Sequence, residues 1–151
     1  MKAKYGLRAL LYLAKQPNLQ TPVLISELAR NEHIPRKFLE AILLELKNNG
    51  ILQSRKGKGG GYFLRKKPEA IRLGRVVRAL DGPLAPVPCV SQTAYAPCDE
   101  CEDEESCGIR LIMKDVRDAM ADVLDNATLA EMLRRIHRSG SSTSGAPMYH
   151  I

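Results

Sequence analysis

The chain of 151 residues lacks any apolar run long enough to cross a membrane. A helix that spans a bilayer needs about 20 consecutive apolar residues, and no stretch here approaches that length. The opening residues, MKAKYG, carry neither the apolar segment nor the small-residue cleavage site of a secretory signal peptide. Both absences predict a cytoplasmic protein that does not interact with membranes.

The chain also lacks the residue patterns that mark most enzymes. No Ser/His/Asp set or carboxylate pair has a spacing that indicates catalysis, and His33, His137 and His150 are isolated from one another. The glycine-rich run 56–61 contains no Gly-Lys-Ser/Thr, and a strand-like run follows it, so it does not match a nucleotide-binding P-loop. We therefore expect a protein that is not an enzyme.

Cysteine is absent everywhere except in one short stretch, which holds Cys89, Cys98, Cys101 and Cys107. In a reducing compartment such a group indicates a metal or redox site more often than a disulfide framework. Thiolates are soft ligands that favour iron–sulfur clusters, zinc or copper(I). The single Cys-x-x-Cys pair is weaker evidence than the two pairs of a zinc ribbon, and an acidic loop with spectator thiols is the alternative.

Charge of the two signs is divided between the two halves of the chain. Residues 1–80 hold 17 Lys/Arg and 5 Asp/Glu (+12), whereas residues 81–151 hold 6 and 12 (−6), which together give the net charge of +6. This division predicts a polyanion-binding first half joined to a part with a different role. A merely lysine-rich, solvated surface is the alternative.

Apolar periodicity predicts three helices in the first half, over residues 4–16, 23–31 and 35–49. Asn48-Asn49-Gly50 is a typical end for the third. The residues expected to face the core are Leu7, Leu10, Leu11, Ala14, Leu24, Ile25, Leu28, Phe38, Leu39, Ile42, Leu43 and Leu46.

A basic, glycine-rich loop follows, between strand-like runs at 51–52 and 62–64, and predicts a hairpin. Helix, turn, helix and hairpin is the order of a winged helix-turn-helix, which we expect over residues 1–82. The second helix of the pair would enter the major groove of DNA, and the hairpin would lie along phosphates or in the minor groove. The predicted DNA-binding residues are Pro35, Arg36, Lys37 and Glu40 on the helix and Arg55, Lys56 and Lys58 on the wing.

The second half begins with a loop over 83–107 that holds every cysteine. A helix over 73–81 precedes this loop, a long amphipathic helix over 108–125 follows it, and a short helix capped by Thr128 continues to residue 138. The Gly/Ser-rich tail, 139–151, is expected to be disordered. The predicted fold class is mainly α with a small β-hairpin wing.

The chain resembles the Rrf-type winged-helix transcription regulators, the family of the iron–sulfur regulator IscR, the nitric-oxide-sensing NsrR and the cysteine-metabolism regulator CymR. The resemblance covers roughly residues 3–135. The motifs that carry it are Ile34, Phe38-Leu39-Glu40, Leu46-Lys47-Asn48-Asn49-Gly50 and Gly59-Gly60-Gly61-Tyr62. It implies a homodimer that pairs through the helix at 108–125 and binds a palindromic double-stranded operator.

The resemblance also implies a cofactor, because sensor members of the family hold a [2Fe–2S] or [4Fe–4S] cluster on three cysteines. Cys101 and Cys107 look like the last two of these, and Cys89 looks like the first by its position in the loop. The gap between Cys89 and Cys101 is longer than in the iron–sulfur regulator, and Cys98 is extra. Arg110 stands where that regulator has a histidine ligand, so Cys98 or a group from the partner subunit would have to be the fourth ligand.

We therefore expect a homodimeric DNA-binding regulator that senses iron–sulfur, redox or nitric oxide status through a cysteine-ligated cluster. One alternative is a cluster-free regulator of the same family, whose cysteines bind zinc or act by thiol chemistry. The alternative from another class is a protein-interaction module, in which the acidic loop docks a partner.

Overall fold

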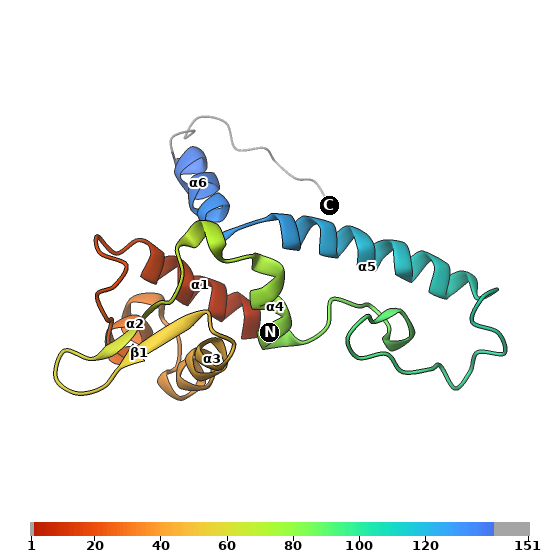
Figure 1. The fold of residues 1–151 in the computed structure, drawn as a ribbon, viewed down its shortest axis with the longest axis horizontal. Helices are drawn as coiled ribbons and strands as arrows, with labels where there is room; N and C mark the ends of the chain where they lie inside the picture. Colours follow the sequence, from red (N-terminus) through yellow and green to blue (C-terminus); the bar gives the residue numbers. More distant parts are fainter. Residues whose placement is uncertain (1, 141–151) are drawn as a thin grey trace.

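The computed structural model describes residues 2–140, and this part of the chain is mainly helical around one small sheet. Four helices and a hairpin form one body, from which α5 extends as a long arm (Figure 1). The elements are α1 Lys2–Ala14, α2 Ile25–Glu32, α3 Arg36–Asn48, β1 Leu52–Arg55, β2 Gly61–Leu64, η1 Pro68–Ala70, α4 Leu73–Asp81, η2 Pro88–Val90, α5 Gly108–Asn126 and α6 Leu129–Gly140. None of the helices within residues 2–140 is long and apolar enough to span a bilayer.

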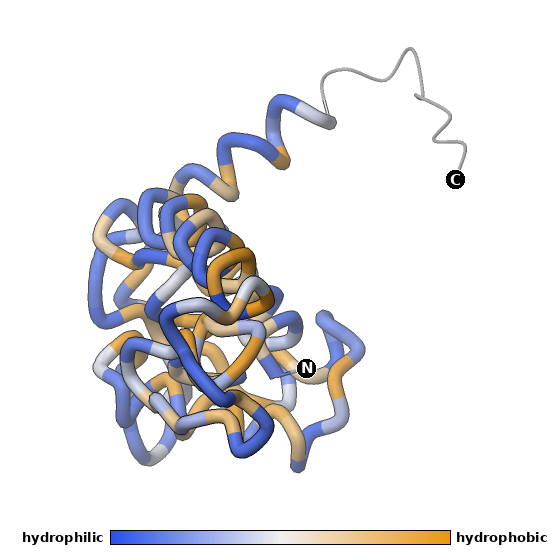
Figure 2. The backbone as a smooth tube through the Cα atoms, turned by 90° about the vertical axis from the view of Figure 1, so that its right-hand side faces the viewer, coloured by the Kyte–Doolittle hydropathy of each residue, from blue (hydrophilic) through white to orange (hydrophobic). Residues whose placement is uncertain are grey.

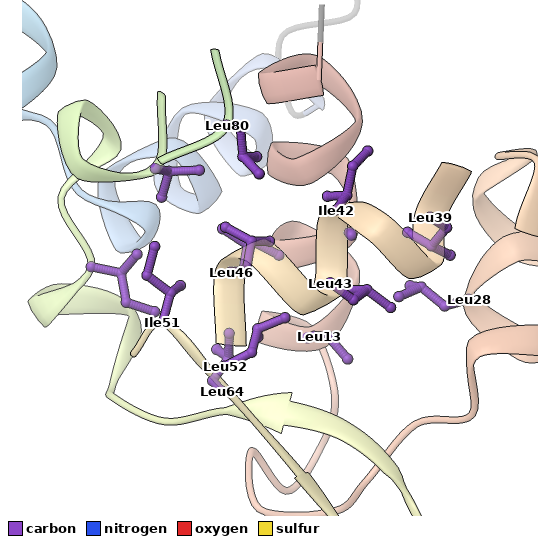
Figure 3. Packing of buried hydrophobic residues seen from close by; sticks show 14 of the residues in the cluster. Leu13, Leu28, Leu39, Ile42, Leu43, Leu46, Ile51, Leu52, Leu64 and Leu80 are labelled. Atoms are coloured by element: carbon purple, nitrogen blue, oxygen red, sulfur yellow. The ribbon is translucent and has the colours of Figure 1, made fainter. Parts of the chain in front are cut away.

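Helix α3 lies at the centre of the core, and the other elements of the first half surround it (Figure 3). Leu39, Ile42, Leu43 and Leu46 have no exposed surface, as the apolar stripe of this helix predicts. Phe38 is only partly buried and meets the Tyr5 ring edge-on, with ring centroids 5.3 Å apart. Blue and orange alternate along the backbone tube of the helices, which is the pattern of amphipathic elements (Figure 2).

Helix α1 buries a different face from the one we expected. Leu10 is buried as predicted, but Leu7, Leu11 and Ala14 are only partly buried. The fully packed seam consists of Ala3, Gly6, Ala9, Leu10 and Leu13. Small residues allow α1 to approach α4 closely, since a Cβ at Gly6 would collide with the side chain of Leu80. A search for large apolar residues overlooks such a seam.

Helix α2 begins two residues later than predicted, and the expectation that Leu24 faces the core is wrong. Val23 and Leu24 are extended, because Val23 pairs in an antiparallel bridge with Tyr62 through two backbone hydrogen bonds of 2.9 Å. Leu24 is 53% exposed, whereas Leu28 is fully buried as predicted. Gly61 permits this bridge, because a Cβ there would collide with the carbonyl oxygen of Val23.

Helices α5 and α6 are attached to the first half at one junction. Leu73 donates a backbone hydrogen bond of 2.9 Å to Ala127, and Leu129 donates one of the same length to Ile71. Thr128 caps α6 as predicted, since its Oγ1 accepts from the Glu131 N–H at 3.1 Å. Of the predicted disordered tail, residues 139–140 belong to α6, and the rest lies outside the described residues.

Candidate functional site

The exposed face of α3 carries the helix residues that the sequence singled out for DNA. Pro35 is the N-cap residue, and Arg36, Lys37 and Pro35 are all exposed. Arg36 and Glu40 form an ion pair one turn apart, with Nε and Oε1 at 3.0 Å. The Arg36 side chain is 66% exposed and that of Glu40 is 45% exposed, so the pair is weak enough for either partner to turn toward a ligand.

The hairpin of β1 and β2 presents the basic wing residues beside α3. Leu52 faces Leu64 and Arg55 faces Gly61 across the two strands, so the turn between them holds Lys56 and Lys58 at its tip. Both lysines are exposed, and the Arg55 guanidinium lies 5.9 Å from the centroid of the Phe63 ring. No Asp or Glu stands between Glu45 and Glu69. The wing therefore offers cations with no carboxylate of its own strands to neutralise them.

Sequence reasoning missed a second set of basic residues at the base of this hairpin. Arg65, Lys66 and Lys67 follow β2 directly and are exposed. Arg65 and Lys47 border a shallow groove of about 380 Å³ beside the strands. The sequence signal was the run of three basic residues directly after the predicted strand 62–64. In the structure the Arg65 N–H donates to the Ile51 carbonyl and continues the ladder beyond that strand.

All four cysteines line one hollow of about 600 Å³ between the loop and the start of α5. Cys89 lies in the short 3-10 helix η2, and Cys107 is the N-cap residue of α5. Cys98 and Cys101 lie in the irregular loop between these two elements. Cys98 is exposed, and the other three are half-buried. The fold thus gathers the predicted ligands around a common space.

Two of these thiols are in direct contact. The pKa of the Cys107 thiol is lowered, chiefly because its sulfur accepts a hydrogen bond from the Arg110 backbone N–H in the first turn of α5. The pKa of the Cys101 thiol is raised by partial burial and by the hydrogen bond between it and Cys107. Cys107 is therefore the more readily ionised of the two, and thiolate is the form that binds metals.

The loop does not form a ready site for a single metal ion. Within residues 2–140, no group of three or more His, Cys, Asp or Glu side chains is close enough together to hold one ion. The donor chemistry fits an iron–sulfur cluster, because four thiols surround one space and two of them touch. A cluster spreads its thiolate ligands over several metal atoms, whereas tetrahedral zinc needs all of its ligands about 2.3 Å from one ion.

Glu104 and Arg110, which line the hollow, belong to a small cluster of polar side chains. Tyr95 donates a hydrogen bond of 2.5 Å to Glu104, and the Arg110 guanidinium lies 3.6 Å from the other Glu104 oxygen. Arg110 occupies the position at which the resemblance would have supplied a histidine ligand. A guanidinium has no lone pair for a metal, so Arg110 can contribute only charge and hydrogen bonds there.

Arg117 connects the cysteine loop to the middle of α5. Its guanidinium donates a hydrogen bond of 2.7 Å to the carbonyl of Val90, the residue after Cys89, and also pairs with Asp118. Near the end of the same helix, Arg78 of α4 binds both carboxylate oxygens of Asp125, at 2.5 and 2.8 Å. Polar contacts thus fasten α5 both to the loop and to the first half.

One face of α5 carries an uncovered apolar stripe. None of the residues from Gly108 to Asn126 is buried. At about 100° per residue one stripe collects five of its exposed apolar side chains. They are Ile109 (69% exposed), Ile112 (60%), Val116 (40%), Met120 (39%) and Val123 (68%). A stripe this long on an ordered helix marks an association surface.

Residues 1–135 match the model of the family Rrf2, described as an iron-dependent transcriptional regulator. An HTH-type regulator named rrf2-like, from Rhodobacter capsulatus, is 42% identical over 134 residues, with 87% of this chain and 89% of the relative covered. CymR of Bacillus subtilis is 33% identical (87% and 86% covered), and IscR of Erwinia tasmaniensis is 30% identical (87% and 76%). The solved structure of B. subtilis CymR, titled a global cysteine regulator, gives a TM-score of 0.70 at 30% identity, covering 89% of this chain and 95% of that one.

Proposed function

The chain belongs to the Rrf2 family of transcriptional regulators, and on that premise we propose that it is a homodimeric, DNA-binding regulator with a cysteine-ligated sensor. The observation that carries the proposal is the gathering of all four cysteines around one hollow at the start of α5. This hollow adjoins the helix whose far end is bound to the DNA-binding half. We place the protein in the cytoplasm, where thiols stay reduced.

The first half supplies the contact with a palindromic double-stranded operator. The N-terminal turns of α3 bring Lys37 and Glu40 to base edges, where lysine suits guanine and glutamate suits the cytosine amino group. Pro35 and Arg36 lead the helix into the groove, and Arg55, Lys56 and Lys58 of the wing bind phosphates. The division is winged helix-turn-helix over 1–82, sensor loop over 83–107 and dimerisation segment over 108–138.

The apolar stripe of α5 pairs two copies of the chain. Pairing of identical stripes is self-complementary, as a two-fold interface requires. Two recognition helices would then contact half-sites about one helical turn, or about 34 Å, apart. Operator affinity depends on that separation, so any change at the loop that alters how α5 sits changes binding.

Cys89, Cys101 and Cys107 would hold a [2Fe–2S] or [4Fe–4S] cluster, with Cys98 or a group from the partner subunit as the fourth ligand. A bound cluster supplies redox chemistry and reactivity toward nitric oxide. The chain's own residues set the conditions for this: the first turn of α5 favours the Cys107 thiolate, and Arg117 fixes the carbonyl of Val90 next to Cys89. Without the cluster, Cys89 and Cys98 would no longer be tied to Cys107 at the start of α5.

A second candidate is a cluster-free regulator whose cysteines bind zinc or react as thiols. Two observations favour the thiol form of this candidate: within residues 2–140 no three-ligand site for one ion is formed, and the relative of solved structure is titled a cysteine regulator. A peroxide would then oxidise the touching Cys101 and Cys107 thiols to a disulfide, and it would take up the two electrons and two protons that the thiols lose.

Anaerobic purification, followed by a visible spectrum and analysis of iron, sulfide and zinc, separates these candidates. We expect a coloured protein that contains iron and acid-labile sulfide. Cys89→Ala, Cys101→Ala and Cys107→Ala should each abolish the colour, and Cys98→Ala should do so if Cys98 is the fourth ligand. Thr93→Ala, an exposed substitution in the same loop, is the matched control and should keep the cluster.

A colourless protein with one zinc per chain would reject the cluster and favour a structural metal site. A colourless, metal-free protein that also fails anaerobic reconstitution would favour thiol chemistry. Specific binding of a selected palindromic duplex at physiological salt excludes the interaction module in either case, because charge alone gives no sequence preference.

A further inference from the structure

Two apolar side chains lie in the middle of the outward face of α3. At about 100° per residue, Lys37, Ala41, Leu44 and Asn48 fall within about 60° of one another around the helix. The buried stripe lies on the opposite side, since Leu43 has no exposed surface while its neighbour Leu44 is 51% exposed. Ala41 is exposed as well. The centre of the recognition face is therefore apolar, with a lysine before it and an amide after it.

The surroundings of this apolar pair identify what covers it. Lys37 lies one turn before Ala41, and Lys47 lies beside Leu44 at the other end of the helix. The wing that follows carries exposed Lys56 and Lys58 and has no acidic residue on its strands. A surface with so many cations is complementary to a polyanion rather than to an apolar protein partner.

In the major groove of DNA, the exposed apolar group on a base pair is the C5 methyl of thymine. We propose that Ala41 and Leu44 form a thymine-reading patch, which contacts thymine methyl groups in each half-site of the operator. This inference rests on the proposed DNA-binding function and specifies the bases that it prefers. The two Cα atoms lie about 4.5 Å apart along the helix axis. Base pairs are stacked about 3.4 Å apart, so the two methyl groups belong to neighbouring or next-but-one steps.

These positions give the residues of α3 two different roles in the recognition of bases. Lys37 and Glu40 meet polar base edges through hydrogen bonds, whereas Ala41 and Leu44 exclude water from methyl groups. Replacing thymine with uracil removes only the methyl group and leaves base pairing unchanged. The loss of one buried methyl corresponds to about a three- to fivefold loss of affinity.

The test uses the full-length protein and a duplex selected from a random pool. Each thymine of the selected duplex is replaced in turn by deoxyuridine, and the dissociation constant is measured at fixed salt. We expect a three- to fivefold loss at one or two positions in each half-site and little change elsewhere. Leu44→Ala should abolish the uracil effect at one of these positions. Ala41→Gln should shift the preference at the other from thymine to adenine, which a glutamine amide recognises.

Leu24→Ala is the matched control, because Leu24 is equally exposed (53%) but lies outside α3. This variant should keep the wild-type pattern of uracil effects. The inference is overturned if the selected duplex binds with the same affinity after every thymine is replaced. It is also overturned if the uracil effects persist unchanged in both Leu44→Ala and Ala41→Gln. Failure to select any duplex would instead reject the proposed function, and the inference with it.

Discussion

Residues 2–81 and the segment from Cys89 to Asn126 are held in place by different means. The first region surrounds α3 with a continuous apolar core, in which Leu10, Leu39 and Leu43 have no exposed surface. In the second region, none of the residues from Gly108 to Asn126 is buried, and Ile109 and Val123 are more than two-thirds exposed. One region is complete within a single chain, and the other leaves its apolar surface uncovered.

The comparison indicates where each kind of function resides. A region with its own core keeps a fixed shape, as a surface that reads a base sequence requires. The second region has no buried residue along α5 and can change its arrangement for a smaller cost in free energy, as the proposed sensor requires. Arg78 connects the two regions through Asp125, and Arg117 binds the loop to α5 within the second region.

The largest expected effect comes from breaking the proposed pairing of α5. Ile112→Glu places a charge on the apolar stripe, and we expect it to convert the dimer to a monomer. Losing the second half-site should weaken operator binding about a thousandfold. Light scattering after gel filtration measures the mass, and Lys114→Glu, on the opposite side of α5, is the control. A dimeric Ile112→Glu protein with unchanged affinity would contradict the proposed interface.

The contrast between buried and exposed leucines in α3 should produce the next largest effect. Leu43→Ala removes a fully buried side chain, and we expect it to lower the free energy of unfolding by about 3 kcal/mol. Leu44→Ala, at the next position and half-exposed, should cost less than about 0.5 kcal/mol. Urea denaturation compares the two variants. Equal losses would mean that α3 packs through a different face.

Within the rigid half, phosphate and base contacts should respond differently to substitution. Lys58→Ala should reduce, by about one unit, the slope of log affinity against log salt concentration. It should also weaken binding to every DNA sequence about five- to tenfold at about 0.1 M salt. Lys56→Ala should behave in the same way. Glu40→Ala should instead change the base preference. Competition titrations over a salt series measure both effects, with Lys114→Ala as control. A loss confined to one base pair for Lys58→Ala would argue against the phosphate role.

The smallest effect concerns the ion pair that joins the two regions. Arg78 lowers the pKa of the Asp125 carboxyl, so the pair stabilises the fold above the unfolded pKa of about 3.9. This contribution is lost as the pH falls through the lower, folded pKa. Because both side chains are partly exposed, Asp125→Asn should cost below about 1 kcal/mol at pH 7. Denaturation should show that the difference in free energy of unfolding between the wild type and Asp125→Asn is smaller at about pH 2.5 than at pH 7. Asp122→Asn is the control.

Much of the fold could be predicted from the sequence, because local pattern and tertiary structure agree in most elements. The family, the winged-helix fold and the absence of enzymatic function are confirmed. The helix at 73–81 has the predicted bounds, and Gly50 ends α3 with a positive φ of 69°. The predictions were wrong where contacts between residues far apart in the sequence determine local conformation or burial. Val23 is extended because it pairs with Tyr62, which is distant in sequence, and Gly6 is buried because Leu80 packs on it.

The candidate site was only partly predictable. The cysteines could be found from the sequence, because all four fall in one loop and none lies elsewhere in the chain. The sequence could not predict the contacts of Arg117 with Val90 and of Arg78 with Asp125, because each joins elements whose relative placement depends on the whole fold. Ala41 and Leu44 were overlooked for another reason: a search for charge passes over apolar residues on the helix that we propose faces DNA.

The length of α5 has a mechanical consequence. Its 19 residues extend about 28 Å. Asp125 is bound near one end, and Cys107 is the cap of the other. If the Asp125 end acts as a fulcrum, a tilt of about 5° moves the Cys107 end by about 2.5 Å. The converse also holds. If the loop displaces the Cys107 end by as little as one sulfur–iron bond length, α5 tilts by several degrees where it meets α4.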